Sequence, residues 1–597
     1  MTTTKSFSEK NRFLTVYKTC LKNQFPFLIV SGIVFFLTLL LPLIVLFVQD
    51  GVPQPNLLEP RFNVIEYGIY VDEMLMVLTS FIPGIFALVL SLSANHYMHN
   101  KRMVDVYHSI PVSRPKLLGA NFLASMTTIF LPFLVNYAIT ILVQLIAMGG
   151  KFRFGPAYAW FTLQDILGAI LFSVLVYVFM TFISVNVGNT FDTFASGGVL
   201  GFAVMFTYLM VGFLTADLTY GFDFSPDSYI VLLSPFTFLF YRYEFVTYND
   251  YQSLFPPGPT LLLYLAAAVL IAVFGFLAVF CYNRRKSELA EQKQSGVFQT
   301  LVKVFASICG VILFYAIFRE TNMVVILVAC VVGAVIIGTI AELIMSRGIR
   351  QFRKNLKWLA GTGVLCCLFM LGARYDVTGY VTRVPNPDKV ESLYINYDGR
   401  FNGLSSYNYN YYKLETNRLT EPESIRIVTD AHRAIVTNPP PTINRYEDYD
   451  THPYERIIVE YKMKNGTTLK RQYSQTYLDA FLMLAQLEDK DDFIRANNPL
   501  FYMDTSDFPL EQRIDRITLW DPYLQDSTRL NLSETNAKLL MNALQEDVLA
   551  ESLEEIHNPS RPEMGYLSVD LRLGPDTKTT NTVQVRLTYE YTRTLAL

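Results

Sequence analysis

Residues 323–345 read MVVILVACVVGAVIIGTIAELIM, an apolar run with a single charged side chain, Glu342. A helix needs about 20 predominantly apolar residues to cross the hydrocarbon core of a bilayer, so this run predicts a membrane-spanning helix. Eight other segments approach or meet that length, at about 25–48, 74–92, 122–148, 166–185, 195–214, 260–282, 301–318 and 356–373. The first is too long for a signal-peptide core and lacks a small-residue cleavage site, so we expect no cleavable signal. The predicted fold class is a polytopic α-helical membrane protein of about nine spans.

The composition divides the chain into two parts. Of 597 residues, 51% are hydrophobic and only 17% are charged, which excludes a disordered, collagen-like or coiled-coil chain. Residues 1–373 contain 24 Lys and Arg against 18 Asp and Glu, a net charge of +6, whereas residues 374–597 contain 25 against 34, a net charge of −9. All six cysteines lie in or beside apolar runs, so residues 374–597 cannot build a disulfide framework. A basic membrane part is therefore joined to an acidic globular domain.

The basic residues between the predicted spans indicate the orientation. Alternate connections carry 18 Lys and Arg on one side of the membrane and five on the other. Because cytoplasmic loops carry the excess of basic residues, we expect a cytoplasmic N-terminus and an extracellular domain at residues 374–597. Residues 1–24 predict a cytoplasmic amphipathic helix, with a solvated tail as the simpler alternative. Its helically spaced apolar residues are Phe13, Val16, Tyr17, Cys20 and Leu21.

The loop between the second and third predicted spans, residues 95–116, reads NHYMHNKRMVDVYHSIPVSRPK. The residue before a proline is pushed out of the helical region, so a short helix is predicted to end at Ile110-Pro111. Lys101, Arg102 and Asp105 would lie outside its apolar face. The residues expected to share that face are Met103, Val106, Tyr107 and Ile110. Such a helix has the form of a docking helix.

This loop resembles that of the membrane subunit of ABC-2 type ABC transporters, the exporter-like permeases of Gram-positive bacteria. The matching pattern is Arg102-x-x-Asp105-x-Tyr107-x-Ser109-Ile-Pro111-Val-Ser113-Arg114. The resemblance implies that the helix is a coupling helix that sits in a groove of an ATPase. The ATPase-coupling residues that it implies are Arg102, Asp105, Tyr107, Ser109, Pro111 and Arg114.

The resemblance covers about residues 1–290. It implies a six-span block at 25–290, with the coupling loop at 95–116 and a large external loop at 215–259. Three additional spans at 291–373 and the extracellular domain depart from the minimal six-span pattern. A C-terminal extension of this sort is similar to one carried by some Firmicute permeases.

Partners follow from what the chain lacks and from the resemblance. The sequence has no Gly-x-x-x-x-Gly-Lys-Ser/Thr loop to cradle phosphates, so we expect no enzyme activity and no cofactor in this chain. The resemblance implies a separate cytoplasmic ABC ATPase subunit that binds ATP and Mg²⁺, and a second copy of the permease or a related one. Membrane lipid is a further expected partner, and nucleic acid is not. The expected location is the plasma membrane of a Gram-positive bacterium.

Other polar and small residues have competing interpretations. His96, His99 and His108 with Asp105 could be imagined as a metal site, but polar residues at the membrane boundary explain them as well, and we expect no metal. Asn136 and Gln144, within the third span, are candidates for interhelical hydrogen bonds or for the transport pathway. In the fifth span, Gly197 and Gly201 form a small-xxx-small pattern that predicts close helix packing, either within the chain or near the pathway and the partner permease.

The acidic domain predicts a tandem α+β architecture, with units at about 385–500 and 501–597. A strand, a helix and a hairpin recur in the same order, and the spacings between equivalent helices and hairpins are 113 and 110 residues. Thr420 and Ser533 are predicted N-caps of the two helices. Asn465-Gly466 predicts a type I′ hairpin turn.

Two classes of function remain open. The leading hypothesis is the permease subunit of an ATP-driven ABC transporter that exports or handles an amphiphilic compound or a peptide antibiotic. The alternative is a membrane receptor or scaffold that senses envelope ligands with its extracellular domain and transports nothing. An enzyme acting on lipid-linked substrates is disfavoured, because the spans contain few acid or base residues.

The orientation is testable by cysteine labelling. In a background without the native cysteines, a cysteine replacing Ser405 should react with a membrane-impermeant thiol reagent on intact cells. One replacing Ser287 should react only after permeabilisation, because the positive-inside rule places the two residues on opposite sides. Labelling of both cysteines on intact cells would contradict the predicted orientation.

Overall fold

The computed structural model describes residues 9–49, 81–148, 156–224, 234–236, 257–291, 297–346, 352–397, 418–437, 457–473, 483–502, 512, 514–521, 526–530, 532–550, 563–572 and 580–588. The chain divides into two compact units. The helical unit holds the described residues up to Met210, residues 234–236 and the described residues from 257 to Cys367. The C-terminal unit combines residues 211–224 with the described residues from Leu368 onward. Residues 211–224 thus group with the acidic domain.

The described residues contain nine helices long and apolar enough to cross a membrane, which confirms the predicted polytopic helical class. They are Phe25–Val45, Phe81–His99, Arg114–Ile146, Thr162–Asn186, Thr190–Leu218, Leu262–Arg284, Phe298–Phe318, Met323–Met345 and Leu356–Arg374. Helices suit such runs because all backbone polar groups are satisfied within the segment. Residues 74–80 of the second predicted span lie outside the described residues.

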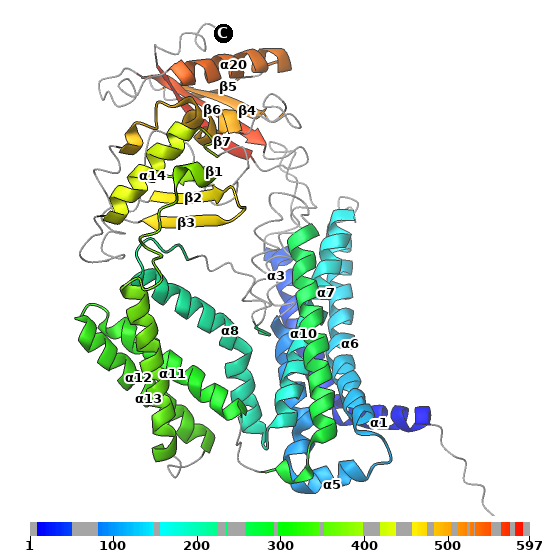
Figure 1. Cartoon of the computed structure of the whole chain (residues 1–597). Coiled ribbons are helices and arrows are strands. Elements are labelled where there is room, and N and C mark those ends of the chain that lie inside the picture. The colour runs from blue at the N-terminus through cyan, green and yellow to red at the C-terminus, as the bar shows by residue number, and fades with distance from the viewer. Residues whose placement is uncertain are drawn as a thin grey trace, which may run out of the picture. The chain divides into compact units, whose positions relative to one another are not determined.

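The helices are shown in Figure 1. The first candidate span comprises α2 (Phe25–Phe35), a π-helical turn (Phe36–Leu40) and α3 (Leu41–Gln49), and the second ends in a 3₁₀ turn, His96–His99. The others are α6 (Arg114–Met148), α7 (Pro156–Asn186), α8 (Thr190–Leu218), α10 (Pro257–Arg284), α11 (Val297–Phe318), α12 (Met323–Ser346) and α13 (Phe352–Arg374). Two short helices, α1 (Glu9–Asn23) and α5 (Lys101–Ser109), lie at the same end of the α6–α7–α10 group, with α1 crosswise to α6.

Hydrogen bonds around Pro132 link the first and third candidate spans. Pro132 has no N–H, so the carbonyl of Thr128 one turn earlier loses its helical partner. The Ser31 hydroxyl donates to that carbonyl at 3.1 Å. The Asn136 amide donates to the Pro132 carbonyl at 2.9 Å and to the Gly32 carbonyl at 3.4 Å. The Thr128 carbonyl, which has no helical partner because of Pro132, therefore takes part in holding the two helices together.

The hairpin of α11 and α12 is closed by two glycines and an ion pair. A Cβ atom on Gly310 would lie 2.3 Å from the carbonyl oxygen of Gly333, so the two backbones touch. Near the other end of the contact, Lys303 forms a salt bridge with Glu342, whose side chain is only 1% exposed. Lys303 on the facing helix therefore neutralises Glu342 inside the hairpin.

Aromatic residues mark both ends of α13, the last of the nine candidate spans in the described residues. Trp358 near the start is 77% exposed, and Tyr375 just after the end is 71% exposed. Amphipathic aromatic rings gather at the two interfaces of a membrane. This pair therefore supports α13 as a spanning helix.

The C-terminal unit contains two antiparallel sheets. The first has the order β1-β2-β3 and is joined by α14 (Pro422–Thr437); its strands are Val390–Asn396, Ile457–Met463 and Thr468–Tyr473. The second has the order β5-β4-β6-β7 and is joined by α20 (Glu534–Ala550); its strands, in chain order from β4, are Ile514–Asp521, Asp526–Leu530, Glu563–Arg572 and Thr580–Thr588. The apolar face of each helix fills the core beside its own sheet. The short helix Asp491–Asn497 contributes Phe493 to the first core and Ile494 to the second.

The predicted caps and turn of this domain have different outcomes. Ser533 accepts a hydrogen bond from the Asn536 N–H at 3.3 Å, which confirms it as an N-cap. Thr420 is not a cap, because α14 begins two residues later with Pro422 at its first position. The predicted type I′ turn is wrong as well. The Met463 N–H donates to the Thr467 carbonyl at 2.8 Å, which leaves residues 464–466 as the loop of the β2–β3 hairpin. Only Gly466 among them has a positive φ, of 81°, so a three-residue loop with a left-handed glycine at its end closes the hairpin instead.

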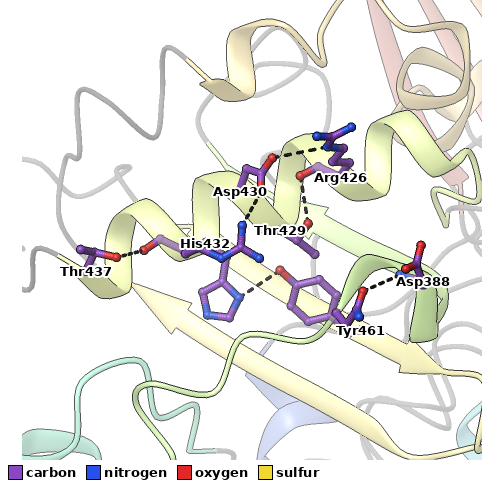
Figure 2. A network of polar contacts seen from close by, with 9 residues as sticks. Asp388, Arg426, Thr429, Asp430, His432, Thr437 and Tyr461 are labelled. Carbon is purple, nitrogen blue, oxygen red and sulfur yellow. Dashed lines mark hydrogen bonds and ion pairs between the residues drawn. The ribbon is translucent and has the colours of Figure 1, made fainter.

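A buried histidine links α14 to the sheet beneath it. His432 Nδ1 is hydrogen bonded to the Tyr461 hydroxyl at 3.0 Å, and its Nε2 to the Tyr473 hydroxyl at 2.7 Å; Figure 2 shows the contact with Tyr461. On the outer face of the same helix, Asp430 pairs with Arg426 and Arg433. Burial, reinforced by the nearby charges of Arg471 and Arg433, lowers the pKa of His432 to about 3.

This pKa predicts an acid-sensitive domain. A histidine that folding keeps neutral contributes stability above its unfolded pKa of 6.5, and that stability is lost as the pH falls from 6.5 toward 3. Between pH 7 and pH 5 the free energy of opening of β2 and β3 should fall by about 2 kcal/mol. Hydrogen exchange on the full chain, corrected for intrinsic rates, measures it. His432→Gln should remove this part of the pH dependence; an identical pH profile in the variant would contradict the assignment.

Candidate functional site

The predicted docking helix is present as α5, and local sequence defines both of its ends. The Asn100 side chain caps the start, accepting hydrogen bonds from the N–H groups of Arg102 and Met103 at 3.0 and 3.3 Å. Ile110 leaves the helical region with ψ of 131°, as expected for a residue before Pro111. A helix of nine residues is marginal on its own in water. Contacts with the rest of the helical unit must therefore hold it.

Tyrosine side chains hold the inner face of α5. Val104 is buried, and the Tyr107 ring stacks on the Tyr97 ring with centroids 4.3 Å apart. The Tyr97 hydroxyl is in turn hydrogen bonded to the Tyr282 hydroxyl at 2.8 Å. The predicted apolar face is therefore divided: Tyr107 faces inward with Val104, while Met103 and Val106 remain exposed.

A buried arginine lies beneath α5. Arg285 donates through Nη1 to the carbonyls of Ser184 at 3.1 Å, of Val187 at 3.0 Å and of Val185. Its Nη2 donates to the Met98 carbonyl at 2.9 Å. The last carbonyls of a helix have no partner within the helix, so this guanidinium caps the C-terminal end of α7. Burial lowers its pKa to about 10, which leaves it charged at neutral pH.

A second arginine, Arg114, caps α10 in the same way. Its Nη1 donates to the carbonyls of Tyr282 and Asn283 at 3.4 Å and to that of Arg285 at 2.9 Å. Arg114 is the first residue of α6. The structure thus gives this predicted coupling residue a positioning contact inside the chain.

The segment after α10 completes the arrangement. Glu291 adopts a left-handed φ of 63°, and its N–H donates to the Gly188 carbonyl at 2.9 Å. Its carboxylate accepts from the N–H of Lys101 at 3.3 Å. We call residues 96–114, 187–189 and 285–291 the three-loop junction. Through it α5 is fixed to the ends of α6, α7, α8 and α10.

The histidines considered as metal ligands have hydrogen-bond partners in this junction. His99 is bonded to Thr190 Oγ1 at 3.0 Å and to the Ser184 carbonyl at 3.1 Å, and His96 to Thr190 Oγ1 at 2.9 Å. His108 Nδ1 lies 3.3 Å from Ser287 Oγ. No group of three His, Cys, Asp or Glu that could hold a metal occurs in the part of the chain that the structure describes. His96 and His99 therefore connect the first loop of the junction to the start of α8, and His108 contacts the third loop.

The outer face of α5 is accessible. Val106 is 63% exposed and Met103 is 37% exposed. Four of the predicted coupling residues surround them and are also exposed, namely Arg102, Asp105, Ser109 and Pro111. The face therefore combines apolar side chains with one positive and one negative charge.

The other predicted residues lie within the helical unit. A Cβ atom on Gly197 would lie 2.4 Å from Met180 Sδ of α7, and one on Gly201 would lie 2.5 Å from the Phe236 ring. Both glycines thus pack within the chain. Asn136 bonds to the first span as described above, and Gln144 is buried.

Sequence reasoning missed Arg285, Tyr97, Tyr282 and Glu291. Arg285 belongs to the run Arg284-Arg285-Lys286, whose charge served only to predict the orientation. Its neighbour Arg284 is exposed, with its guanidinium over the Phe280 ring at 4.1 Å. Composition and spacing give these adjacent arginines the same weight, and only the fold distinguishes them.

No protein-family model, curated protein or solved structure matches this chain. The resemblance of residues 102–114 to a coupling helix is therefore a hypothesis carried by those residues and by the geometry of the junction.

Arg285 should be the residue on which the junction depends most. Arg285→Met leaves the carbonyls of α7 and of Met98 without their donor, and should lower the free energy of unfolding of the helical unit by about 3 kcal/mol. Arg285→Lys should recover part of the loss, because one ammonium cannot reproduce the planar fork of donors. Thermal unfolding in detergent, followed with a probe that fluoresces on reacting with buried cysteines, measures both.

Arg284→Met is the matched control, since it removes the same side chain one residue away. It should cost less than about 1 kcal/mol, the value of an exposed cation–π contact. Equal losses from Arg284→Met and Arg285→Met would show that the junction does not depend on the buried guanidinium.

Proposed function

We propose that this chain is the membrane-spanning permease subunit of an ATP-driven ABC transporter of the ABC-2 type, in the plasma membrane of a Gram-positive bacterium. Its N-terminus and α5 face the cytoplasm, and residues 374–597 lie outside the cell. A separate ABC ATPase subunit binds ATP and Mg²⁺ and docks on α5. A second copy of this chain, or a related permease, completes the transporter.

The observation that carries the proposal is the combination of an accessible outer face and a firmly held inner face on α5. Coupling requires a surface to which an ATPase can bind and a rigid connection from that surface to the spans. Exposed Met103, Val106 and Asp105 supply the surface. The three-loop junction supplies the connection, since its hydrogen bonds reach the ends of α7, α8 and α10. A displacement of α5 would therefore be passed to those helices.

The polarity of the spans supports an amphiphilic substrate. None of the nine candidate spans in the described residues has a charged residue at its middle. Asp165, Lys303 and Glu342 lie toward span ends, and Lys303 and Glu342 pair with each other. A pathway for small ions or protons usually has ionisable groups at membrane depth. An amphiphilic compound or a peptide antibiotic needs no such groups and is the class of substrate that we propose.

The test is co-expression and reconstitution with an ABC ATPase subunit from the same organism. The two proteins should co-purify, and the permease should stimulate ATP hydrolysis. Reversing a charge and removing the helix stop together, in Asp105→Arg with Pro111→Ala, should reduce that stimulation by about tenfold, because like charges placed opposite each other at an interface are strongly unfavourable.

Glu320→Arg is the control, because Glu320 is an exposed acidic residue on the proposed extracellular side. It should change the stimulation by less than about twofold. Membrane insertion of all variants is checked by their yield in the detergent-solubilised monodisperse fraction. Normal ATP hydrolysis by the double variant would reject the coupling role, and a chain that binds no ATPase would favour the receptor alternative.

A further inference from the structure

The segment that follows α8 is built into the C-terminal unit. Residues 219–224, which we call the strap, begin directly after α8 ends at Leu218. The Gly221 carbonyl accepts a hydrogen bond from the N–H of Gln472 in β3 at 3.2 Å. The strap therefore covers the edge of the first sheet at β3, as Leu419 covers the opposite edge by bridging to Leu393 of β1.

The backbone at position 221 requires a glycine, for two reasons. Its φ is +75°, a region that other residues rarely adopt. A Cβ atom there would also lie 2.6 Å from the Tyr473 ring. Both the backbone conformation and the close approach to Tyr473 thus require the absence of a side chain.

Three side chains of the strap fix it to the domain. Tyr220 is part of the first core, with its ring centroid 5.0 Å from that of Tyr473. The Phe222 ring lies 5.6 Å from the Tyr380 ring. Asp223 forms a salt bridge with Lys470 of β3, and the Asp223 side chain is 11% exposed.

The strap is also held against its own helix. The Phe224 ring folds back over Gly212 of α8, where a Cβ atom would lie 1.9 Å away. It also packs on Phe213, with ring centroids 5.0 Å apart. The last two turns of α8 and the strap therefore form one packed element.

The end of α13 belongs to the same assembly. The Thr219 hydroxyl donates to the Ala373 carbonyl at 3.3 Å. After α13, the Asp376 carboxylate accepts hydrogen bonds from the N–H groups of Tyr380 and Val381 at 2.5 and 2.9 Å. The Tyr380 hydroxyl in turn donates to the Lys470 carbonyl of β3 at 3.3 Å, so the segment after α13 is attached to the sheet. The ends of two candidate spans and the first sheet are thus packed as one body.

We infer that α8 is a conformational link between the three-loop junction and the domain formed by residues 374–597. One end of this continuous helix is bound to the junction, since Thr190 is hydrogen bonded to His96 and His99. The other end is bound to β3 through the strap. Because coupling between two sites is reciprocal, a change in the domain alters the junction, and a change at the junction alters the domain.

The link does not require the proposed function. If an ATPase docks on α5, the link makes the extracellular domain both an input to ATP hydrolysis and a reporter of it. A failure of that docking would leave the structural link intact, and the following experiment contains no ATPase.

Hydrogen exchange on the full chain in lipid nanodiscs tests the link at both ends. Asp223→Lys places like charges together at the strap and should accelerate exchange of the Gln472 amide by about tenfold. Exchange should also change in the first turn of α8, at residues 191–193. Adding Lys470→Asp to Asp223→Lys restores the ion pair with reversed charges and should return both regions toward the wild-type rates. Gly221→Val should open the strap by strain, independently of charge.

Glu391→Lys is the matched control. Glu391 pairs with Lys462 on the same sheet at 3.5 Å, and both side chains are more exposed than Asp223. This variant should leave the strap and α8 unchanged. Unaltered exchange at Gln472 in both Asp223→Lys and Gly221→Val would overturn the docking of the strap. Faster exchange at Gln472 with no change at residues 191–193 would overturn transmission through α8.

Discussion

The three-loop junction depends on the hydrogen bonds from Arg285 to main-chain carbonyls. Burying a guanidinium is costly unless its donors are satisfied. Here they are satisfied by the end of α7 and by Met98, next to α5. Arg114 binds main-chain carbonyls at the end of α10 in the same way. Because both arginines bind backbone atoms, they fix the helix ends next to α5, and the packing of Val104 and Tyr107 then holds α5 against them.

The sequence predicts the spans well and the junction poorly, for a physical reason. A long apolar run has few alternatives to a spanning helix, since no other structure satisfies its backbone in lipid. The burial of Arg285 depends on four carbonyls contributed by residues about 100 and 187 positions away, and no local pattern encodes it. The division of α5 likewise depends on Tyr97, whose ring draws Tyr107 inward. Lys303 and Glu342 show the same limit, because their pairing depends on how α11 meets α12.

Local chemistry decides the smaller features only where nothing competes with it. Ser533 caps its helix through the hydrogen bond from the Asn536 N–H to its hydroxyl. Thr420 has the right side chain, but Leu419 beside it is drawn into a bridge with Leu393, and Pro422 two positions later is well suited to begin a helix. At the β2–β3 turn, Gly466 alone takes the left-handed conformation, and an extra residue in the loop closes the hairpin.

The way in which α8 can move follows from its contacts. It has 29 residues and is therefore about 44 Å long. Gly197 and Gly201 bring Met180 and Phe236 against its backbone, and the Gly201 carbonyl accepts hydrogen bonds from Ser234 Oγ and from the N–H of Phe236. Such close contacts do not stretch gradually, because packed interfaces exchange one arrangement for another. We therefore expect α8 to shift between discrete positions, so that the two ends of the helix would change state together.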